Sequence, residues 1–203
     1  MKAHMKERQE GSVLVEFAIV VPLLVLLTFG IIEFAMLFNA DSNVSQSTRA
    51  GGRSAAILST DPQMEFKAAE AAANALDISP SSITGSPTVC VGKYDATSTD
   101  PCGDFAVHLT LVHPTTPNTP VWEVQVPGQP QPGVYPPTDS WPVASRNFGC
   151  GQNGTFDKVV VHVTIAHNLI VGSMFKGFFG GSATPTLASS SVFALEPVPS
   201  TSC

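Results

Sequence analysis

Glu16 stands inside an apolar run, where a carboxylate is costly to hold. From residue 12 to residue 38 the chain is almost wholly apolar, and Glu16 and Glu33 are its only charged residues. An ionised carboxylate at the bilayer centre costs roughly 2.5–3.5 kcal/mol unless it finds a partner. Glu33 lies near the outer end of the run and can reach the interface, whereas Glu16 lies about one turn inside it. Glu16 is therefore the residue that requires an explanation.

Proteolysis just before the apolar run would supply a partner for Glu16. No Lys or Arg follows Glu16 until Arg49. A cut after Gly11 would give Ser12 a free α-amine, whose pKa of about 7.7–8.0 keeps it largely cationic at neutral pH. That amine would neutralise Glu16 of the same chain or of a neighbouring chain. The alternative is that Glu16 reaches the inner interface of an uncleaved anchor.

The apolar run itself has the length of a transmembrane helix. A helix over residues 12–38 is about 40 Å long, which exceeds the hydrocarbon core of about 30 Å. The apolar core of a secretory signal is shorter, about 7–15 residues. We therefore expect residues 1–11 to be a cytoplasmic leader and 12–38 to be a retained transmembrane helix.

The flanking charges predict the orientation of this helix. Lys2, Lys6 and Arg8 precede it, and no basic residue follows until Arg49 and Arg53. Basic residues favour the cytoplasmic side. We expect a single-pass protein of the inner or cytoplasmic membrane, with its N-terminus inside and its C-terminal region outside.

The cysteines fit an outer location. All four lie after the apolar run, and two disulfides are plausible in an oxidising compartment. Of three possible pairings we favour a short loop between Cys90 and Cys102, with Cys150 joined to Cys203. The chain has no C-x-x-C pair, so a cysteine metal site is not expected.

The segment GSVLVEF, from Gly11 to Phe17, resembles the cleavage motif of type IV pilin-like precursors. In that motif a short basic leader ends in Gly, and the apolar helix that follows carries a Glu and then an aromatic residue. Here these residues are Glu16 and Phe17. Over residues 11–57 the chain resembles the TadE family of minor pilins or pseudopilins of the tight-adherence (Tad/Flp) pilus. The features that carry this resemblance are Pro22, the Gly30-x-x-Glu33-Phe34 segment and the Arg49-x-Gly51-x-Arg53-x-Ala55 pattern.

The resemblance implies a prepilin peptidase that cuts between Gly11 and Ser12. It also implies pilus assembly with other Tad minor pilins, the major Flp pilin and the Tad assembly platform, and a place in the pilus at the cell surface. The expected subunit and assembly contacts are Glu16, Phe17, Pro22, Glu33, Arg49 and Arg53. Arg49 and Arg53 share a helix face, which is either simply exposed or meets anionic headgroups or a partner.

Beyond the membrane we expect a helical stalk over 39–60 and an α+β domain over 61–203. Gly51 and Gly52 in the stalk are understandable where another chain packs very close or where the helix bends. A helix over 62–77, capped by Asp61 with Pro62 in its first turn, should cover one face of an antiparallel sheet. Alternating apolar residues predict the strands at 88–92, 104–112, 121–126, 157–170 and 187–195.

Two loops interrupt this pattern. Nine of the 17 prolines lie in the loop 114–142, which cannot be a central strand because proline donates no ladder hydrogen bond. Its aromatic residues form either a contact surface or, as we favour, a lid packed onto the sheet. The segment 170–181 is a second loop, with three phenylalanines that dip into the membrane, bind a partner or join the core.

The composition and the motifs of the sequence do not favour an enzyme. Sixteen acidic against 10 basic residues give a net charge of −6, which argues against nucleic-acid binding. The sequence lacks a G-x-S-x-G elbow, a P-loop, a G-x-G-x-x-G turn and an H-E-x-x-H motif. We expect no cofactor, no metal and no small-molecule substrate, although a cross-strand pair such as His108 and His162 leaves a metal site open. The rival to a pilin is an uncleaved, membrane-anchored binding or structural domain.

Overall fold

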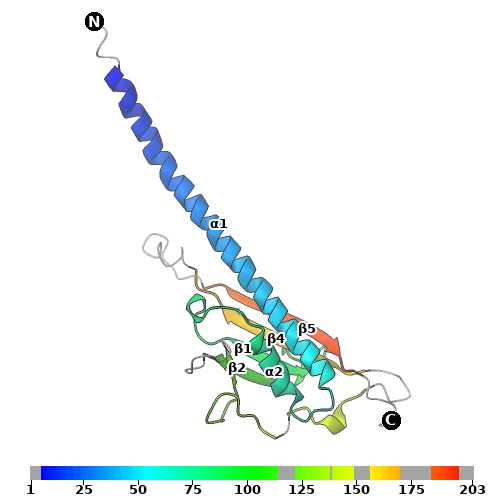
Figure 1. Ribbon diagram of the computed structural model, residues 1–203. Helices are drawn as coiled ribbons and strands as arrows, with labels where there is room; N and C mark the ends of the chain where they lie inside the picture. The colour runs from blue at the N-terminus through cyan, green and yellow to red at the C-terminus, as the bar shows by residue number, and fades with distance from the viewer. Residues whose placement is uncertain (1–5, 114–121, 138, 149–155, 170–183, 197–203) are drawn as a thin grey trace. The chain divides into compact units, whose positions relative to one another are not determined.

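The computed structural model describes residues 6–113, 122–137, 139–148, 156–169 and 184–196 of the chain, and side chains from residue 13 onward. Helix α1, Lys6–Ile57, runs without a break through residues that belong to two compact units. The first unit contains α1 up to Phe38, and the second contains Asn39–Asn168 and the residues from Thr184. We call the described part of the second unit the α+β domain (Figure 1).

The domain is built on one five-stranded antiparallel sheet. Its strands are β1 (Thr88–Lys93), β2 (Asp104–Val112), β3 (Glu123–Gln125), β4 (Lys158–Ala166) and β5 (Thr186–Ala194). Their order is β3-β2-β1-β4-β5, so β5 and β3 lie at the two ends of the sheet. All four pairings are antiparallel. The predicted α+β class and all five predicted strands are confirmed, with β3 and β4 shorter than expected.

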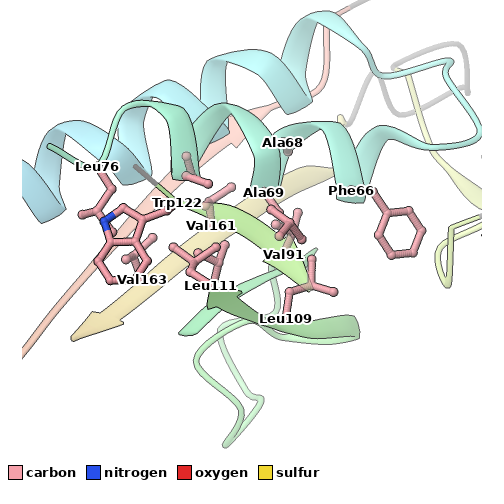
Figure 2. Packing of buried hydrophobic residues seen from close by; sticks show 14 of the residues in the cluster. Phe66, Ala68, Ala69, Leu76, Val91, Leu109, Leu111, Trp122, Val161 and Val163 are labelled. Atoms are coloured by element: carbon pink, nitrogen blue, oxygen red, sulfur yellow. The ribbon is translucent and has the colours of Figure 1, made fainter. Parts of the chain in front are cut away.

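Strand alternation explains which face is covered. In β4 the side chains of Val159, Val161, Val163 and Ile165 are buried on one face, as the period of two requires. Helix α2, Met64–Asn74, packs on this face and lies mainly over β1 and β3. Figure 2 shows Phe66, Ala68, Ala69 and Leu76 from α2 and the turn after it above Val91, Leu109, Leu111, Val161 and Val163 of the sheet.

The last part of α1, residues 39–57, belongs to the core of the domain. The buried residues of its inner face are Ala40, Val44, Ser47, Thr48, Gly51, Gly52, Ala55 and Ala56. A Cβ on Gly51 would meet the Ala68 carbonyl oxygen at 2.9 Å and Val161 Cγ1 at 3.1 Å, while the Phe193 ring occupies the corresponding space at Gly52. The close packing anticipated at these glycines therefore comes from α2, β4 and β5 of the same chain. Residues 39–57, which were expected to form a helical stalk, thus pack into the α+β domain.

Helix α2 begins later than the sequence suggested. Pro62 was expected in the first turn and Asp61 at the cap, but α2 starts at Met64. The Asp61 carboxylate accepts a hydrogen bond from Gln63 N at 2.7 Å, and it also pairs with Lys67. The Asp139 carboxylate lies 3.1 Å and 3.2 Å from Glu65 N and accepts that amide, which is one of the first donors of the helix. A residue 74 positions away thus satisfies the helix end, which local pattern alone does not reveal.

The aromatic residues of the Pro-rich loop pack inward. Trp122 and Trp141 are buried, and the Trp122 indole donates to the Ile78 carbonyl oxygen at 3.1 Å. Tyr135 stacks on Phe66 of α2, with ring centroids 5.5 Å apart. This arrangement agrees with the favoured lid. The loop 170–181 lies outside the described residues.

Candidate functional site

The first candidate site is the exposed apolar part of α1, residues 13–38. The helix contains an 18-residue window with mean hydropathy 2.6 and none of that window is buried. Valine, leucine, isoleucine and phenylalanine side chains point outward along this segment. Exposed apolar surface of this extent is unfavourable in water. By length and composition the helix is able to cross a membrane, and it suggests single-pass anchoring.

The charged and special residues of this segment are spread along it. Glu16 and Phe17 are exposed, as is Pro22, whereas Glu33 is only 8 % exposed. The 17 positions between the two glutamates correspond to about 25 Å of helix, slightly less than the hydrocarbon thickness. Gly11 and Ser12 lie within α1, and their side chains are not described.

Pro22 interrupts the series of backbone hydrogen bonds in the same segment of α1. Pro22 has no N–H and therefore cannot donate to the Ala18 carbonyl four residues earlier. Six residues later the Thr28 hydroxyl donates to the Leu24 carbonyl oxygen at 2.8 Å. Water cannot satisfy backbone groups in the hydrocarbon core. The helix thus contains one carbonyl that a neighbouring helix or polar side chain can bind.

Arg49 and Arg53 lie in the α+β domain part of α1, apart from the glutamates. Both side chains are exposed, and four residues separate them, so they are neighbours on the helix surface. Within the part of the chain that the structure describes, the ion pairs use other cations: Lys67, Lys93, His108 and Arg146. The structure therefore does not gather the predicted assembly residues into one site.

The disulfide predicted between Cys90 and Cys102 is present, with a Cα–Cα distance of 6.0 Å. It lies on the sheet face opposite the helices, where Val160 and Ala106 pack against it. Cys150 and Cys203 lie outside the described residues. The disulfide joins Cys90 within β1 to Cys102 in the turn before β2, next to Asp100, whose carboxylate accepts the Cys102 amide at 2.8 Å.

The histidines considered for a metal site are not direct neighbours. Strand β1 lies between β2 and β4, so Cys90 stands opposite both His108 and His162 and separates them. His108 Nε2 lies 2.9 Å from Asp100 Oδ2, and His162 contacts the Ser190 and Thr164 hydroxyls. Cys90, Asp100 and His108 have the ligand types of a metal site, but a sulfur in a disulfide is not the thiolate that binds metal. Without that sulfur, the pair of Asp100 and His108 remains.

A buried ionic cluster joins the turn after α1, the start of α2 and the Pro-rich loop. Arg146 is fully buried and donates from Nη2 to Asp139 Oδ2 at 2.6 Å. Its Nη1 donates to the carbonyl oxygens of Ser59 and Asp61 at 2.7 Å and 2.8 Å. Its Nε and Nη2 also bind the Trp141 carbonyl oxygen. Since a guanidinium has five N–H donors, this arrangement uses it completely. We call Glu65, Asp139, Trp141 and Arg146 the Arg146 cluster.

Both acids of this cluster, Glu65 and Asp139, have raised pKa values. Burial, followed by the neighbouring Asp139 charge, raises the pKa of Glu65 to about 7. Burial also raises the pKa of Asp139 to about 6, against the lowering effects of the Glu65 amide and Arg146. Ser140 Oγ lies 2.9 Å from Glu65 Oε2 and 2.7 Å from the Phe105 carbonyl oxygen. Ser140 N also donates to Glu65 Oε2 at 2.9 Å, and these hydrogen bonds from Ser140 oppose the rise in the Glu65 pKa.

Sequence reasoning missed the Arg146 cluster. Its members come from positions 65 to 146, and the three strands β1, β2 and β3 intervene in the chain. One signal was present, because Arg146 is the only Lys or Arg between Lys93 and Lys158. A lone cation in a charge-poor stretch suggests a specific partner. The cluster joins the Pro-rich loop to the turn after α1 and to the start of α2.

These features define a class: an α+β domain attached to one apolar helix that is able to span a membrane. The family model described as TadE-like protein matches residues 11–53. The match contains Glu16, Pro22, Arg49 and Arg53, so the resemblance expected from the sequence is confirmed over this segment. No curated protein and no solved structure matches the chain.

Proposed function

We propose that this protein is a minor pilin or pseudopilin that takes part in assembly of a Tad-type pilus. The observation that carries the proposal is the exposed apolar segment of α1, which coincides with the TadE-like match. A helix that is apolar all round is suited first to lipid and then to the packed helices of a filament. The α+β domain would remain outside the helical core of such a filament.

The proposed topology places the leader inside and the domain outside. The basic residues Lys2, Lys6 and Arg8 before the apolar segment support an internal N-terminus. The Cys90–Cys102 disulfide supports an oxidising compartment for the domain. The protein would be stored as a single-pass protein of the inner or cytoplasmic membrane before it enters the pilus.

Processing after Gly11 by a prepilin peptidase is the chemical step of this proposal. The cut would leave the Ser12 α-amine four residues before Glu16, one helical turn away. Inside hydrocarbon an amine and a carboxylate each require a partner, and this pair supplies one to each. Pairing with Glu16 of a neighbouring subunit would join two helices by the same chemistry.

The role is structural, without a catalytic site, cofactor, small-molecule substrate or nucleic acid. The expected partners are the prepilin peptidase, other Tad minor pilins, the major Flp pilin and the assembly platform. Glu16, Phe17, Pro22 and Glu33 would contact neighbouring helices. The Arg146 cluster supports this reading because all five N–H donors of its guanidinium bind groups of the same chain.

The first test is the start of the mature chain in its own host. N-terminal sequencing and intact mass, with and without the peptidase, should give a chain that begins at Ser12 only when the peptidase is present. A chain that still begins at Met1 in both strains would contradict processing. It would favour the uncleaved membrane-anchored domain, because it removes the proposed charge partner of Glu16.

The second test is the substitution Glu16→Ala. We expect pilus assembly to fail while the chain remains in the membrane fraction after carbonate extraction, since an alanine is easier to insert than a carboxylate. Glu7→Ala is a matched control, because Glu7 would leave with the leader. Normal pili in the Glu16→Ala strain would show that the pairing role is wrong.

A further inference from the structure

Charged residues of opposite sign lie near the two ends of the sheet. One end is β5, whose sequence TLASSSVFA contains neither a charge nor a proline over nine residues. Edge strands present unpaired backbone N–H and C=O groups, and natural proteins often protect them with charges, prolines or bulges. The regular pairing of β5 with β4 shows no such device within the strand. This end of the sheet is thus suited to a neighbour.

Helix α1 places two arginines beside β5. Ser45 and Thr48 contact Ser189 and Ser191 of β5 through their hydroxyls, at 3.4 Å and 2.9 Å. Arg49 follows Ser45 by four residues, so it lies on the flank of α1 nearest to β5. Arg53 follows Arg49 by another four residues, and both side chains are exposed. We call this the basic edge.

The opposite end of the sheet holds a cavity of about 210 Å³ between α2, β3 and the Pro-rich loop. Glu70 from α2 and Glu123 from β3 bring two carboxylates to it, and Trp122 and Tyr135 provide aromatic walls. Its other lining residues are Ala73, Asn74, Val124, Pro132 and Gly133. We call this the acidic edge.

The ion pairs of the described residues use the carboxylates of Asp61, Asp100, Asp139 and Asp157, and not those of Glu70 and Glu123. The pKa of Tyr135 rises to about 12, because its phenol is buried and also faces the charges of Glu70 and Glu123. The cavity therefore combines negative potential with flat aromatic surface, which suits a planar guanidinium.

We propose that the acidic edge binds Arg49 and Arg53 of a second copy of this chain. The two edges lie at opposite ends of the same sheet, so the contact is head-to-tail and can repeat from copy to copy. The contact deepens the proposed function and rests on it, because only an assembling subunit needs a repeating contact.

A second copy fits the basic edge better than lipid headgroups do. Arg49 and Arg53 belong to the compact unit of the α+β domain, whereas the apolar segment up to Phe38 belongs to the other unit. The acidic edge of a second copy offers carboxylates and aromatic rings, which are groups that bind a guanidinium.

Charge reversal in the full-length chain tests the contact. One variant carries Glu70→Arg with Glu123→Arg, and the other carries Arg49→Glu with Arg53→Glu. Each variant should associate with itself about tenfold more weakly than the natural chain, since like charges then meet. A mixture of the two variants should recover association, because each reversed edge then finds its complement. Co-purification of two differently tagged copies from nanodiscs measures both effects.

Matched controls are Asp104→Arg and Lys158→Glu, which reverse exposed charges on β2 and β4 that belong to neither edge. These should associate as the natural chain does. Unchanged self-association of either edge variant, or no recovery in the mixture despite native melting temperatures, would overturn the contact. Anionic vesicle binding that is lost in the Arg49→Glu, Arg53→Glu variant, without loss of self-association, would assign the basic edge to lipid instead. None of these readouts needs a pilus or a cut at Gly11, so failure here is distinct from failure of the proposed function.

Discussion

The two halves of α1 form one continuous helix but use opposite side chains. Residues 13–38 carry large aliphatic and aromatic side chains, and nearly all of these are exposed. Residues 39–57 bury small and polar ones, among them Ser47, Thr48, Gly51 and Ala55. In the first half hydrophobicity matches the lipid that surrounds the helix. In the second half residue size determines how closely α2 and the sheet can approach. Along this one helix, therefore, the large hydrophobic side chains are exposed in the first half and small or polar residues are buried in the second.

The largest loss of stability for residues 39–57 should come from removing the buried Arg146 guanidinium, which binds the turn after α1. Arg146→Met leaves Asp139 as an uncompensated buried carboxylate, and it frees the Ser59 and Asp61 carbonyls. We expect a loss of about 3–5 kcal/mol in the free energy of unfolding. Thermal unfolding of the detergent-solubilised chain measures it. Arg53→Met, at an exposed arginine, is the control and should change stability little; equal melting of both variants would contradict the role of the cluster.

The pH dependence of the domain's free energy of unfolding tests the same Arg146 cluster. The pKa of Glu65 in the folded chain, about 7, lies above its ordinary value of 4.5, so the folded state binds the proton more tightly. The stabilisation is complete below pH 4.5 and is lost as the pH rises through 7. Asp139, whose pKa is also raised, has the same sign. We expect the free energy of unfolding to fall by on the order of 2–3 kcal/mol between pH 4.5 and 7.5.

The substitution Glu65→Gln isolates this effect. A glutamine has no proton to lose, so the pH profile between 4.5 and 7.5 should become flatter. Glu70→Gln, at an exposed position of the same helix, should leave the slope in place. A profile unchanged by Glu65→Gln would show that another group produces the pH dependence.

Two glycines sharpen the comparison between the halves of α1. A side chain at Gly52 would enter the space of the Phe193 ring, whereas nothing lies within 4 Å of the corresponding position at Gly30. We expect Gly52→Val to destabilise the domain by about 2 kcal/mol through overpacking. Gly30→Val should leave the melting temperature of the domain unchanged. Similar melting of the two variants would mean that residues 39–57 do not pack as closely as described.

Features that depend on local patterns could be predicted from the sequence, whereas features that depend on contacts between distant residues could not. The strands could be predicted because alternation in β2 and β4 is a local pattern, and β2 has the predicted bounds of 104–112. The apolar segment and the short Cys90–Cys102 loop are local as well. The Arg146 cluster and the Asp139 contact to α2 were missed, because their partners lie far apart in the chain. The two charged edges became visible only with the strand order, since Arg49 and Glu123 carry no sign of which sheet end they will occupy.

The hydroxyls of Ser47 and Thr28 give the smallest expected difference in stability between the two halves of α1. Ser47 Oγ donates to the Ala72 carbonyl oxygen at 2.7 Å, across to α2. Ala72 belongs to the last four residues of α2, whose carbonyls have no partner within the helix. Thr28 Oγ1 donates at 2.8 Å to Leu24 of its own helix and is exposed.

Removing the two hydroxyls should therefore have unequal effects. Ser47→Ala leaves a buried carbonyl without this donor, and we expect the free energy of unfolding to fall by about 1 kcal/mol. Thr28→Ala removes a bond to a carbonyl that already has its place in the helical ladder, so the stability of the domain should not change. Hydrogen exchange at the C-terminal end of α2, compared with thermal unfolding, distinguishes the cases: it should quicken in Ser47→Ala only. Equal exchange in both variants would mean that the contact between α1 and α2 rests on shape alone, with no contribution from this hydrogen bond.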